Sequence, residues 1–251
     1  MIKRQYIRMK IIFFIVSLVF IFAMIVFSGC SKSESIIVVS PPTPLPPVII
    51  TDTLVIKYLA LGDSYTIGEG VSAPERYPSQ AAVLLRQKGI FFGSVEYIAQ
   101  TGWTTTNLAA AIASKNLTNT YDIVTLLIGV NDQYQKNDTT GYRAKFTNLL
   151  ETSIRLAANK KSRVIVLSIP DYGITPFGAG WPKVGIQIDQ FNEINKSVTN
   201  EYKVAYLDIT VISRRAANNS GLILGYGPHF TGAEYGLWAV PLADLIAKAL
   251  K

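Results

Sequence analysis

The sequence predicts an α/β protein in which residues 53–251 form a three-layer α/β/α sandwich around a central parallel sheet. Short apolar runs alternate along the chain with longer amphipathic segments, which is the order expected of strands and helices in such a sheet. One run, residues 121–129 (YDIVTLLIG), is almost continuously apolar. A strand that is covered by helices on both faces has this composition.

The individual elements follow from the same alternation. We expect strands over residues 53–62, 94–100, 121–129, 163–170 and 204–209. We expect helices over residues 77–88, 104–114, 142–159 and 186–202, and from about residue 232 to the C-terminal end. Gly89 is placed to stop the first helix, and a run of threonines starts the second. Thr231 and Glu234 have the spacing of a capping box, which predicts the start of the last helix.

The first 29 residues are predicted to be a bacterial lipoprotein signal peptide rather than part of the fold. Four basic residues precede an apolar run over residues 11–27, and the segment FSGC then ends in Cys30. Small residues directly before a cysteine resemble a lipobox, where the cysteine becomes the lipidated N-terminus of the mature chain. An uncleaved transmembrane anchor is the alternative, because the apolar run is nearly long enough to span a bilayer. Either interpretation places the folded part outside the cytoplasm, in the bacterial cell envelope.

A linker is predicted between Cys30 and the folded domain. Residues 30–52 contain the segment PPTPLPP, which favours polyproline II, a semi-rigid spacer of about 3.1 Å per residue. No second linker or internal repeat follows. We therefore expect residues 53–251 to form one domain.

The composition of the chain limits which partners and cofactors we expect. The net charge of +7 falls to +3 once the four basic residues of the signal segment are removed, and no basic run suggests a nucleic-acid partner. Lipid on Cys30, rather than charge, would hold the protein at a membrane. The chain has one cysteine and one histidine, so it lacks the ligands of a usual zinc site and cannot form an internal disulfide. We expect no metal ion and no other cofactor.

Polar, glycine-containing segments follow the first four predicted strands, which is where a parallel sheet places reactive groups. They are GDSYTIGEG (62–70), AQTGWTT around Gly102, GVNDQYQ (129–135) and PDYGITPFG (170–178). Each segment taken alone also fits an ordinary turn. The only histidine, His229, lies in GYGPHF directly before the last helix, so we expect a partly exposed position in a loop.

Together these residues resemble the SGNH hydrolases, the GDSL-type esterase and lipase family. Ser64 in GDSY, Gly102, Asn131 in GVND and His229 in YGPHF match the family's four signature residues in order, and the resemblance covers residues 53–251. It implies the flavodoxin-like form of the sandwich. It implies Ser64 as nucleophile and His229 as base, with an oxyanion hole made by the backbone N–H groups of Ser64 and Gly102 and the amide of Asn131. The chain lacks a G-x-S-x-G elbow, which disfavours an ordinary α/β-hydrolase.

One position departs from the family pattern. The family usually places an aspartate three residues before the histidine, and this chain has Tyr226 there. The carboxylate that orients the base is therefore missing from its usual place. Asp208, at the end of the last predicted strand, or a backbone carbonyl could take its role.

The function expected from this resemblance is that of a cell-envelope serine esterase acting through an acyl-enzyme. Its substrates would be small-molecule or glycan esters, such as acetyl groups on glycans, in a shallow site without a lid because the predicted loops are short. Hydrolysis of acyl thioesters or lysophospholipids is the alternative within the same class. Tyr226 favours a different class, a lipid-anchored glycan-binding or inactive protein with the same fold. A purely structural surface protein would explain the lipobox and linker but none of the strand-end residues.

Overall fold

The computed structural model describes residues 55–251, with the exception of residues 119 and 137. The predicted signal peptide, the lipidation site Cys30 and the linker lie outside the described residues, as do the first two residues of the predicted domain. Those assignments remain predictions.

A parallel sheet of five strands forms the middle of the described domain. The strands are β1 (Tyr58–Gly62), β2 (Glu96–Ala99), β3 (Ile123–Leu127), β4 (Val164–Leu167) and β5 (Ala205–Leu207). Their order across the sheet is β2-β1-β3-β4-β5, which is the flavodoxin-like, doubly wound order. Every residue of β1, β3 and β4 is buried, as apolar runs covered on both faces require. The predicted fold class is confirmed.

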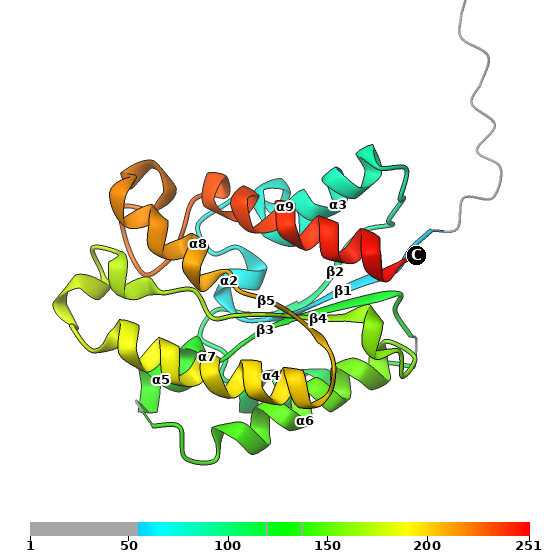
Figure 1. The fold of residues 1–251 in the computed structure, drawn as a ribbon, viewed down its shortest axis with the longest axis horizontal. Helices are drawn as coiled ribbons and strands as arrows, with labels where there is room; N and C mark the ends of the chain where they lie inside the picture. The colour runs from blue at the N-terminus through cyan, green and yellow to red at the C-terminus, as the bar shows by residue number, and fades with distance from the viewer. Residues whose placement is uncertain (1–54, 119, 137) are drawn as a thin grey trace, which may run out of the picture. The chain divides into compact units, whose positions relative to one another are not determined.

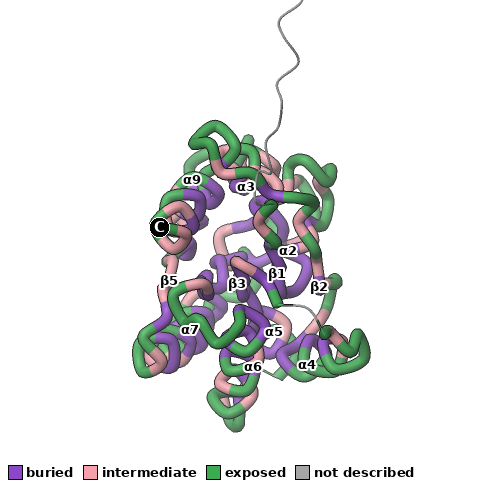
Figure 2. Tube along the Cα trace, turned by 90° about the vertical axis from the view of Figure 1, so that its right-hand side faces the viewer, coloured by how far each residue is buried: buried purple, intermediate pink, exposed green. Residues whose placement is uncertain are grey.

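Helices cover both faces of the sheet (Figure 1), and the buried strands lie between the two helical layers (Figure 2). One layer holds α3 (Tyr77–Gln87) and α9 (Gly232–Ala249), which pack against each other. The other holds α4 (Thr105–Ser114), α6 (Tyr142–Leu156) and α7 (Val184–Glu201). None of the helices between residues 55 and 251, outside the two undescribed positions, is long and apolar enough to cross a membrane.

Three short helices were not predicted. They are α2 (Ser64–Ile67), α5 (Val130–Lys136) and α8 (Thr210–Arg215). Each begins within three residues of the end of a strand, in a segment whose glycine, aspartate and asparagine residues also fit a plain turn. The ten longer elements all form, although most are shorter than predicted. The difference lies at the ends of the elements, where the sequence pattern continues past the last residue in regular helix or strand geometry.

The predicted capping box of the last helix does not form. Thr231 is the N-cap of α9, but its hydroxyl donates to the carbonyl oxygen of Gly221 at 2.9 Å. The buried carboxylate of Glu234 instead accepts a hydrogen bond from the indole N–H of Trp238 at 2.8 Å. The spacing located the helix start correctly, but Thr231 takes a partner outside the helix and Glu234 takes one further along the same helix.

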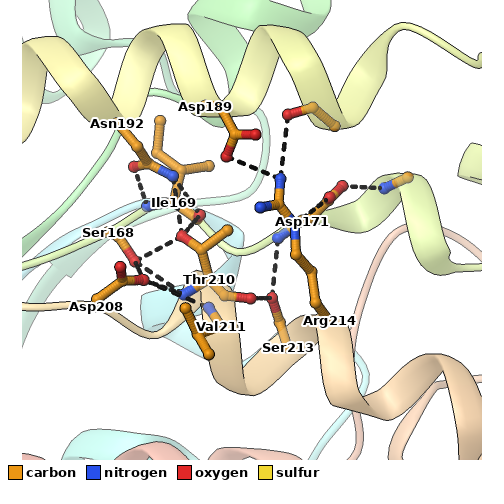
Figure 3. A network of polar contacts seen from close by, with 12 residues as sticks. Ser168, Ile169, Asp171, Asp189, Asn192, Asp208, Thr210, Val211, Ser213 and Arg214 are labelled. Carbon is orange, nitrogen blue, oxygen red and sulfur yellow. Dashed lines mark hydrogen bonds and ion pairs between the residues drawn. The ribbon is translucent and has the colours of Figure 1, made fainter.

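The connection from β4 to α7 spans residues 168–183, so the expectation of uniformly short loops was wrong. A partly buried ion pair anchors its start: Nε of Arg214 donates to the carboxylate of Asp171 at 2.9 Å (Figure 3). The same guanidinium binds Asp189 on α7 at 2.8 Å, and Asp171 also accepts from the N–H of Gly173 at 2.8 Å. One arginine on α8 therefore holds this long segment against α7.

Candidate active site

All four of the predicted site residues line one pocket of about 230 Å³ at the carboxyl ends of the strands. The lining residues are Ser64, Tyr65, Thr101, Gly102, Val130, Asn131, Tyr134, Tyr172, Phe177, Pro228 and His229. The predicted nucleophile, base and oxyanion donors come from segments far apart in the sequence. The sheet brings them together because parallel strands end at one edge.

Ser64 is the first residue of α2, directly after the N-cap Asp63. The Asp63 carboxylate accepts from the N–H of Tyr65 at 3.0 Å, and its carbonyl accepts from the next two N–H groups of the helix. No hydrogen bond between described residues uses the N–H of Ser64 itself. This donor at a helix N-terminus therefore remains available to a ligand oxygen.

Gly102 follows β2 and adopts a left-handed backbone conformation, with φ of +82°. Residues with a side chain rarely adopt this conformation, so the turn requires glycine. A Cβ added here would meet no atom within 4 Å. The turn therefore selects glycine for its backbone conformation, while the open space beside it lies free for a substrate.

Asn131 lies in the first turn of α5, where it is partly exposed. Its Nδ2 group donates one hydrogen bond to the carbonyl oxygen of Trp103 at 3.0 Å, which leaves the second N–H of the amide for another acceptor. The adjacent Asp132 is buried and accepts from both the N–H and the hydroxyl of Thr105, at 2.8 and 2.6 Å. These bonds tie the start of α5 to the start of α4 and fix the amide in place.

His229 is only 8 % exposed, so the expected partial exposure was wrong in degree. Its imidazole packs edge-on against the ring of Tyr65, with centroids 5.4 Å apart. The Tyr65 hydroxyl donates to the carbonyl oxygen of Pro228 at 2.9 Å, and the carbonyl of His229 accepts from the N–H of Leu224 at 3.1 Å. The residue after the predicted nucleophile therefore holds the loop that carries the predicted base. Sequence reasoning missed Tyr65, and its position next to Ser64 was the only available signal.

Two opposing influences set the pKa of His229. Burial lowers the pKa below its ordinary value of 6.5, because the imidazolium loses hydration. The carboxylate of Glu69, in the segment that follows Ser64, raises it by a smaller amount. The imidazole is therefore neutral at pH 7 and can accept a proton.

A comparison with protein-family models shows the family of this chain. Residues 60–237 match the model of the GDSL-like lipase/acylhydrolase family. The chain belongs to this family. Its members are esterases and acylhydrolases, and the matched region contains Ser64, Gly102, Asn131 and His229. A search of curated proteins found no match.

Solved structures of similar fold include several members of the GDSL family. A lipase/acylhydrolase from Enterococcus faecalis has a TM-score of 0.62 and 22 % identity, over 78 % of this chain and 97 % of its own. A lipolytic GDSL-family protein from Veillonella parvula has a TM-score of 0.59 and 17 % identity, over 76 % and 98 %. An acetyl xylan esterase from Geobacillus stearothermophilus has a TM-score of 0.54 and 18 % identity, over 76 % and 94 %. At these identities, the likeness establishes the fold.

Within this GDSL-family domain, Tyr226 does not replace the orienting aspartate. Its side chain is 67 % exposed, and its hydroxyl lies beside Gly70, where an added Cβ would be 3.3 Å away. Nδ1 of His229 faces Gly227, where an added Cβ would be 3.6 Å away. Across the described part of the chain, neither ring nitrogen of His229 makes a hydrogen bond.

Asp208 serves the fold of this family member rather than its base. Its carboxylate accepts from the N–H groups of Thr210 and Val211, at 3.0 and 3.3 Å, and from the hydroxyl of Ser168 at 3.3 Å (Figure 3). These contacts hold the first turn of α8. The carboxylate is therefore committed to a helix end, as a structural aspartate would be.

Three aromatic residues complete the wall of the pocket. Tyr134 comes from α5, and Tyr172 and Phe177 come from the long connection after β4. Their ring centroids lie 6.1 to 6.4 Å apart. Sequence reasoning did not assign them to the site, because an aromatic residue beyond the end of a strand carries no signal of what it faces.

Proposed function

We propose that this protein hydrolyses carboxylic esters through an acyl-enzyme formed on Ser64. The observation that carries the proposal is the meeting of Ser64, Gly102, Asn131 and His229 in one pocket at the ends of the strands. A serine hydroxyl is a weak nucleophile until an adjacent base takes its proton. His229 is the only histidine in the chain, and its lowered pKa keeps it in the basic form at neutral pH.

The first half of the reaction transfers the acyl group. The Ser64 oxygen attacks the ester carbonyl carbon while His229 takes the hydroxyl proton. The carbonyl oxygen becomes an oxyanion, which accepts hydrogen bonds from the N–H groups of Ser64 and Gly102 and from the amide of Asn131. The bond to the alcohol oxygen then breaks, and the alcohol leaves with the proton held by His229.

Water completes the cycle. His229 takes a proton from a water molecule, whose oxygen attacks the acyl carbon. The same donors bind the second oxyanion, and the bond to Ser64 breaks as His229 returns the proton to the serine oxygen. The products are a carboxylic acid and an enzyme in its starting state.

The size of the pocket favours a short acyl group such as acetyl. About 230 Å³ is below the range of ordinary small-ligand sites, which is about 300–1,000 Å³. A long acyl chain would have to extend beyond this pocket. The acetyl xylan esterase among the similar folds is consistent with an acetyl ester of a glycan as substrate.

Labelling with a fluorophosphonate probe and hydrolysis of 4-nitrophenyl acetate test the assignment. We expect Ser64→Ala to abolish labelling, and Ser64→Ala and His229→Ala each to remove nearly all turnover without additive effects, because the two side chains act as a unit. Asn131→Ala should lower turnover by about 10²–10³, the usual cost of one oxyanion donor. Additive losses of a few-fold would show that these residues only maintain the fold.

An exposed tyrosine in the place of the family's aspartate favours a second candidate, a glycan-binding protein without turnover. The two functions separate in the same experiment. If the protein only binds glycans, the wild type should bind a glycan but react with neither the probe nor any ester.

We also propose that the protein is anchored in the cell envelope by lipid on Cys30, on the basis of the FSGC segment that follows the apolar run. Cys30→Ala should then leave the precursor uncleaved and without lipid. Incorporation of labelled fatty acid into wild type and variant measures this directly, and equal incorporation would refute the lipobox assignment.

A further inference from the structure

A second cavity of about 500 Å³ adjoins the pocket of Ser64. It is lined by Gln133, Tyr134, Tyr172, Trp181, Pro182, Lys183, Val184 and Gln187. Tyr134 and Tyr172 line both spaces, so the two cavities are adjacent at these two residues. A substrate whose ester lies at Ser64 can therefore extend its other part into the second cavity.

Two neighbouring aromatic rings of the second cavity are exposed. Tyr134 is 49 % exposed and Trp181 44 %, and their ring centroids lie 5.8 Å apart. Phe177 packs edge-on against Trp181 at 5.0 Å and fixes its orientation. Large aromatic side chains that neighbour one another at the surface without entering the core mark a binding site.

Polar groups in the same cavity are arranged as hydrogen-bond donors. The buried Gln133 donates to the side-chain oxygen of Gln187 at 2.8 Å and accepts from the hydroxyl of Tyr172 at 2.9 Å. The hydrogen bond from Gln133 orients the amide of Gln187. The NH₂ group of Gln187 has no acceptor among the residues that the structure describes. Lys183 adds an exposed ammonium, and no aspartate or glutamate belongs to the lining among the described residues.

We propose that this second cavity binds a pyranose ring of the alcohol part of the substrate, so that the substrates are O-acylated glycans. The inference rests on the proposed esterase function. The apolar face of a sugar ring stacks on an exposed aromatic surface such as that of Trp181 and Tyr134, while its hydroxyl groups accept from Gln187 and Lys183. An acyl chain would match the rings but would leave these amide and ammonium groups without partners.

Trp181 and Gln187 are the residues to change, because they line the second cavity and do not line the pocket of Ser64. Ile186 provides a matched control, since it lies in α7 next to Gln187 and is 64 % exposed but lines neither cavity. The substrates are 4-nitrophenyl acetate, 4-nitrophenyl decanoate and O-acetylated methyl glycosides of glucose, xylose and N-acetylglucosamine.

The proposal predicts that the variants of the second cavity lose more kcat/KM on sugar esters than on esters without a sugar. Trp181→Ala should reduce kcat/KM for at least one glycoside acetate about tenfold more than for 4-nitrophenyl acetate, in line with the loss of one stacking contact. Gln187→Ala should show the same preference, and Ile186→Ala should leave all the rates at the wild-type level. Equal losses on every substrate would overturn the glycan site while leaving the esterase function intact.

Two other outcomes also overturn the proposal. A loss of kcat/KM at Trp181→Ala that appears with the decanoate and not with the glycosides would assign the cavity to an acyl chain.

If the wild type hydrolyses no ester, the esterase function fails. Calorimetric titration of the wild type with the same glycosides then tests separately whether the second cavity binds a sugar. Binding that Trp181→Ala weakens and Ile186→Ala does not would support the sugar site, and the absence of binding would refute it.

Discussion

At the scale of single residues, His229 is held close to Ser64 without a carboxylate beside its ring. Tyr226 stands at the sequence position of the family's aspartate, so this position supplies a phenol and not a carboxylate. Among the carboxylates of the described domain, the one that raises the pKa of His229 is Glu69. Its side chain also accepts a short hydrogen bond from the hydroxyl of Thr101, which lines the pocket.

Changing the charge next to His229 should move the pH dependence of catalysis in a defined direction. Tyr226→Asp adds an anion near the imidazole and should raise its pKa, whereas Glu69→Gln removes an anion and should lower the pKa. The base acts in its neutral form, so the acidic limb of the kcat/KM profile should move to higher pH in Tyr226→Asp and to lower pH in Glu69→Gln. Profiles measured with 4-nitrophenyl acetate test this.

Turnover of Tyr226→Asp should also rise, because a carboxylate stabilises the imidazolium that forms during attack. Tyr226→Asn is the uncharged control of similar size and should change neither the pKa nor turnover in this way. Asp208→Asn should alter stability more than catalysis, since its carboxylate holds α8. If Tyr226→Asp is folded but no faster, and Asp208→Asn abolishes activity, the acid is Asp208.

Asp63 is predicted to make stability depend on pH. Its side chain is fully buried, and burial, with a smaller effect from Asp132, raises its pKa from 3.8 to about 8. One carboxylate oxygen has no hydrogen-bond partner within the described residues. Because the folded state holds the proton more tightly, the stabilisation is complete below about pH 4 and is lost as pH rises toward 8.

Asp63→Asn tests this dependence, since asparagine keeps the size of the protonated acid and does not titrate. Unfolding free energies in urea at a series of pH values should fall less between pH 4 and 8 in the variant than in the wild type. Asp244→Asn, at an exposed aspartate paired with Lys88, is the control. An identical slope in wild type and Asp63→Asn would contradict a buried, protonated Asp63.

At the scale of elements, the contact between α2 and the loop before α9 decides where the base lies. The Tyr65 hydroxyl binds the carbonyl of Pro228, and a bridge between Ile223 and Phe230 closes the loop. Tyr65→Phe removes only the hydroxyl. It should cost about 1 kcal/mol of stability, the usual net value of one hydrogen bond, and should also lower turnover because His229 is no longer held in register.

Tyr58→Phe is the matched control for this element contact. It removes another buried tyrosine hydroxyl, which binds the hydroxyl of Thr125 at 3.1 Å and does not line the pocket. We expect a similar loss of unfolding free energy but no loss of turnover on 4-nitrophenyl acetate. If the two variants lose turnover equally, Tyr65 acts on stability alone and the loop is positioned by other contacts.

At the scale of the whole molecule, the sheet and both helical layers of the described domain belong to one compact unit. We expect a chain starting at Thr53 to have the same unfolding free energy, within about 0.5 kcal/mol, as one starting at Cys30, because the proline-rich sequence of residues 30–52 predicts a spacer and not a part of the fold. Both chains should hydrolyse a soluble ester equally well. Denaturant unfolding and kinetics compare them, and a less stable shorter chain would show that the linker contributes to the fold.

The amino-acid sequence alone was enough to predict the fold class and the four residues that meet at the edge of the sheet. Alternating apolar and amphipathic segments specify a parallel sheet between helices, because each element must bury its apolar face. Ser64, Gly102, Asn131 and His229 were identifiable because together, and in this order, they resemble the four signature residues of the SGNH hydrolases. Their meeting in one pocket follows from the rule that parallel strands end together.

The surroundings of these residues, by contrast, depend on tertiary packing. Tyr65, Trp181 and Gln187 carry no motif, and their positions depend on how α2, the segment 168–183 and α7 pack against distant parts of the chain. The same packing committed the hydroxyl of Thr231 to the carbonyl oxygen of Gly221 instead of a capping box. Local spacing specifies which hydrogen bonds a side chain can make, whereas the partner it takes depends on which groups the folded chain brings within reach.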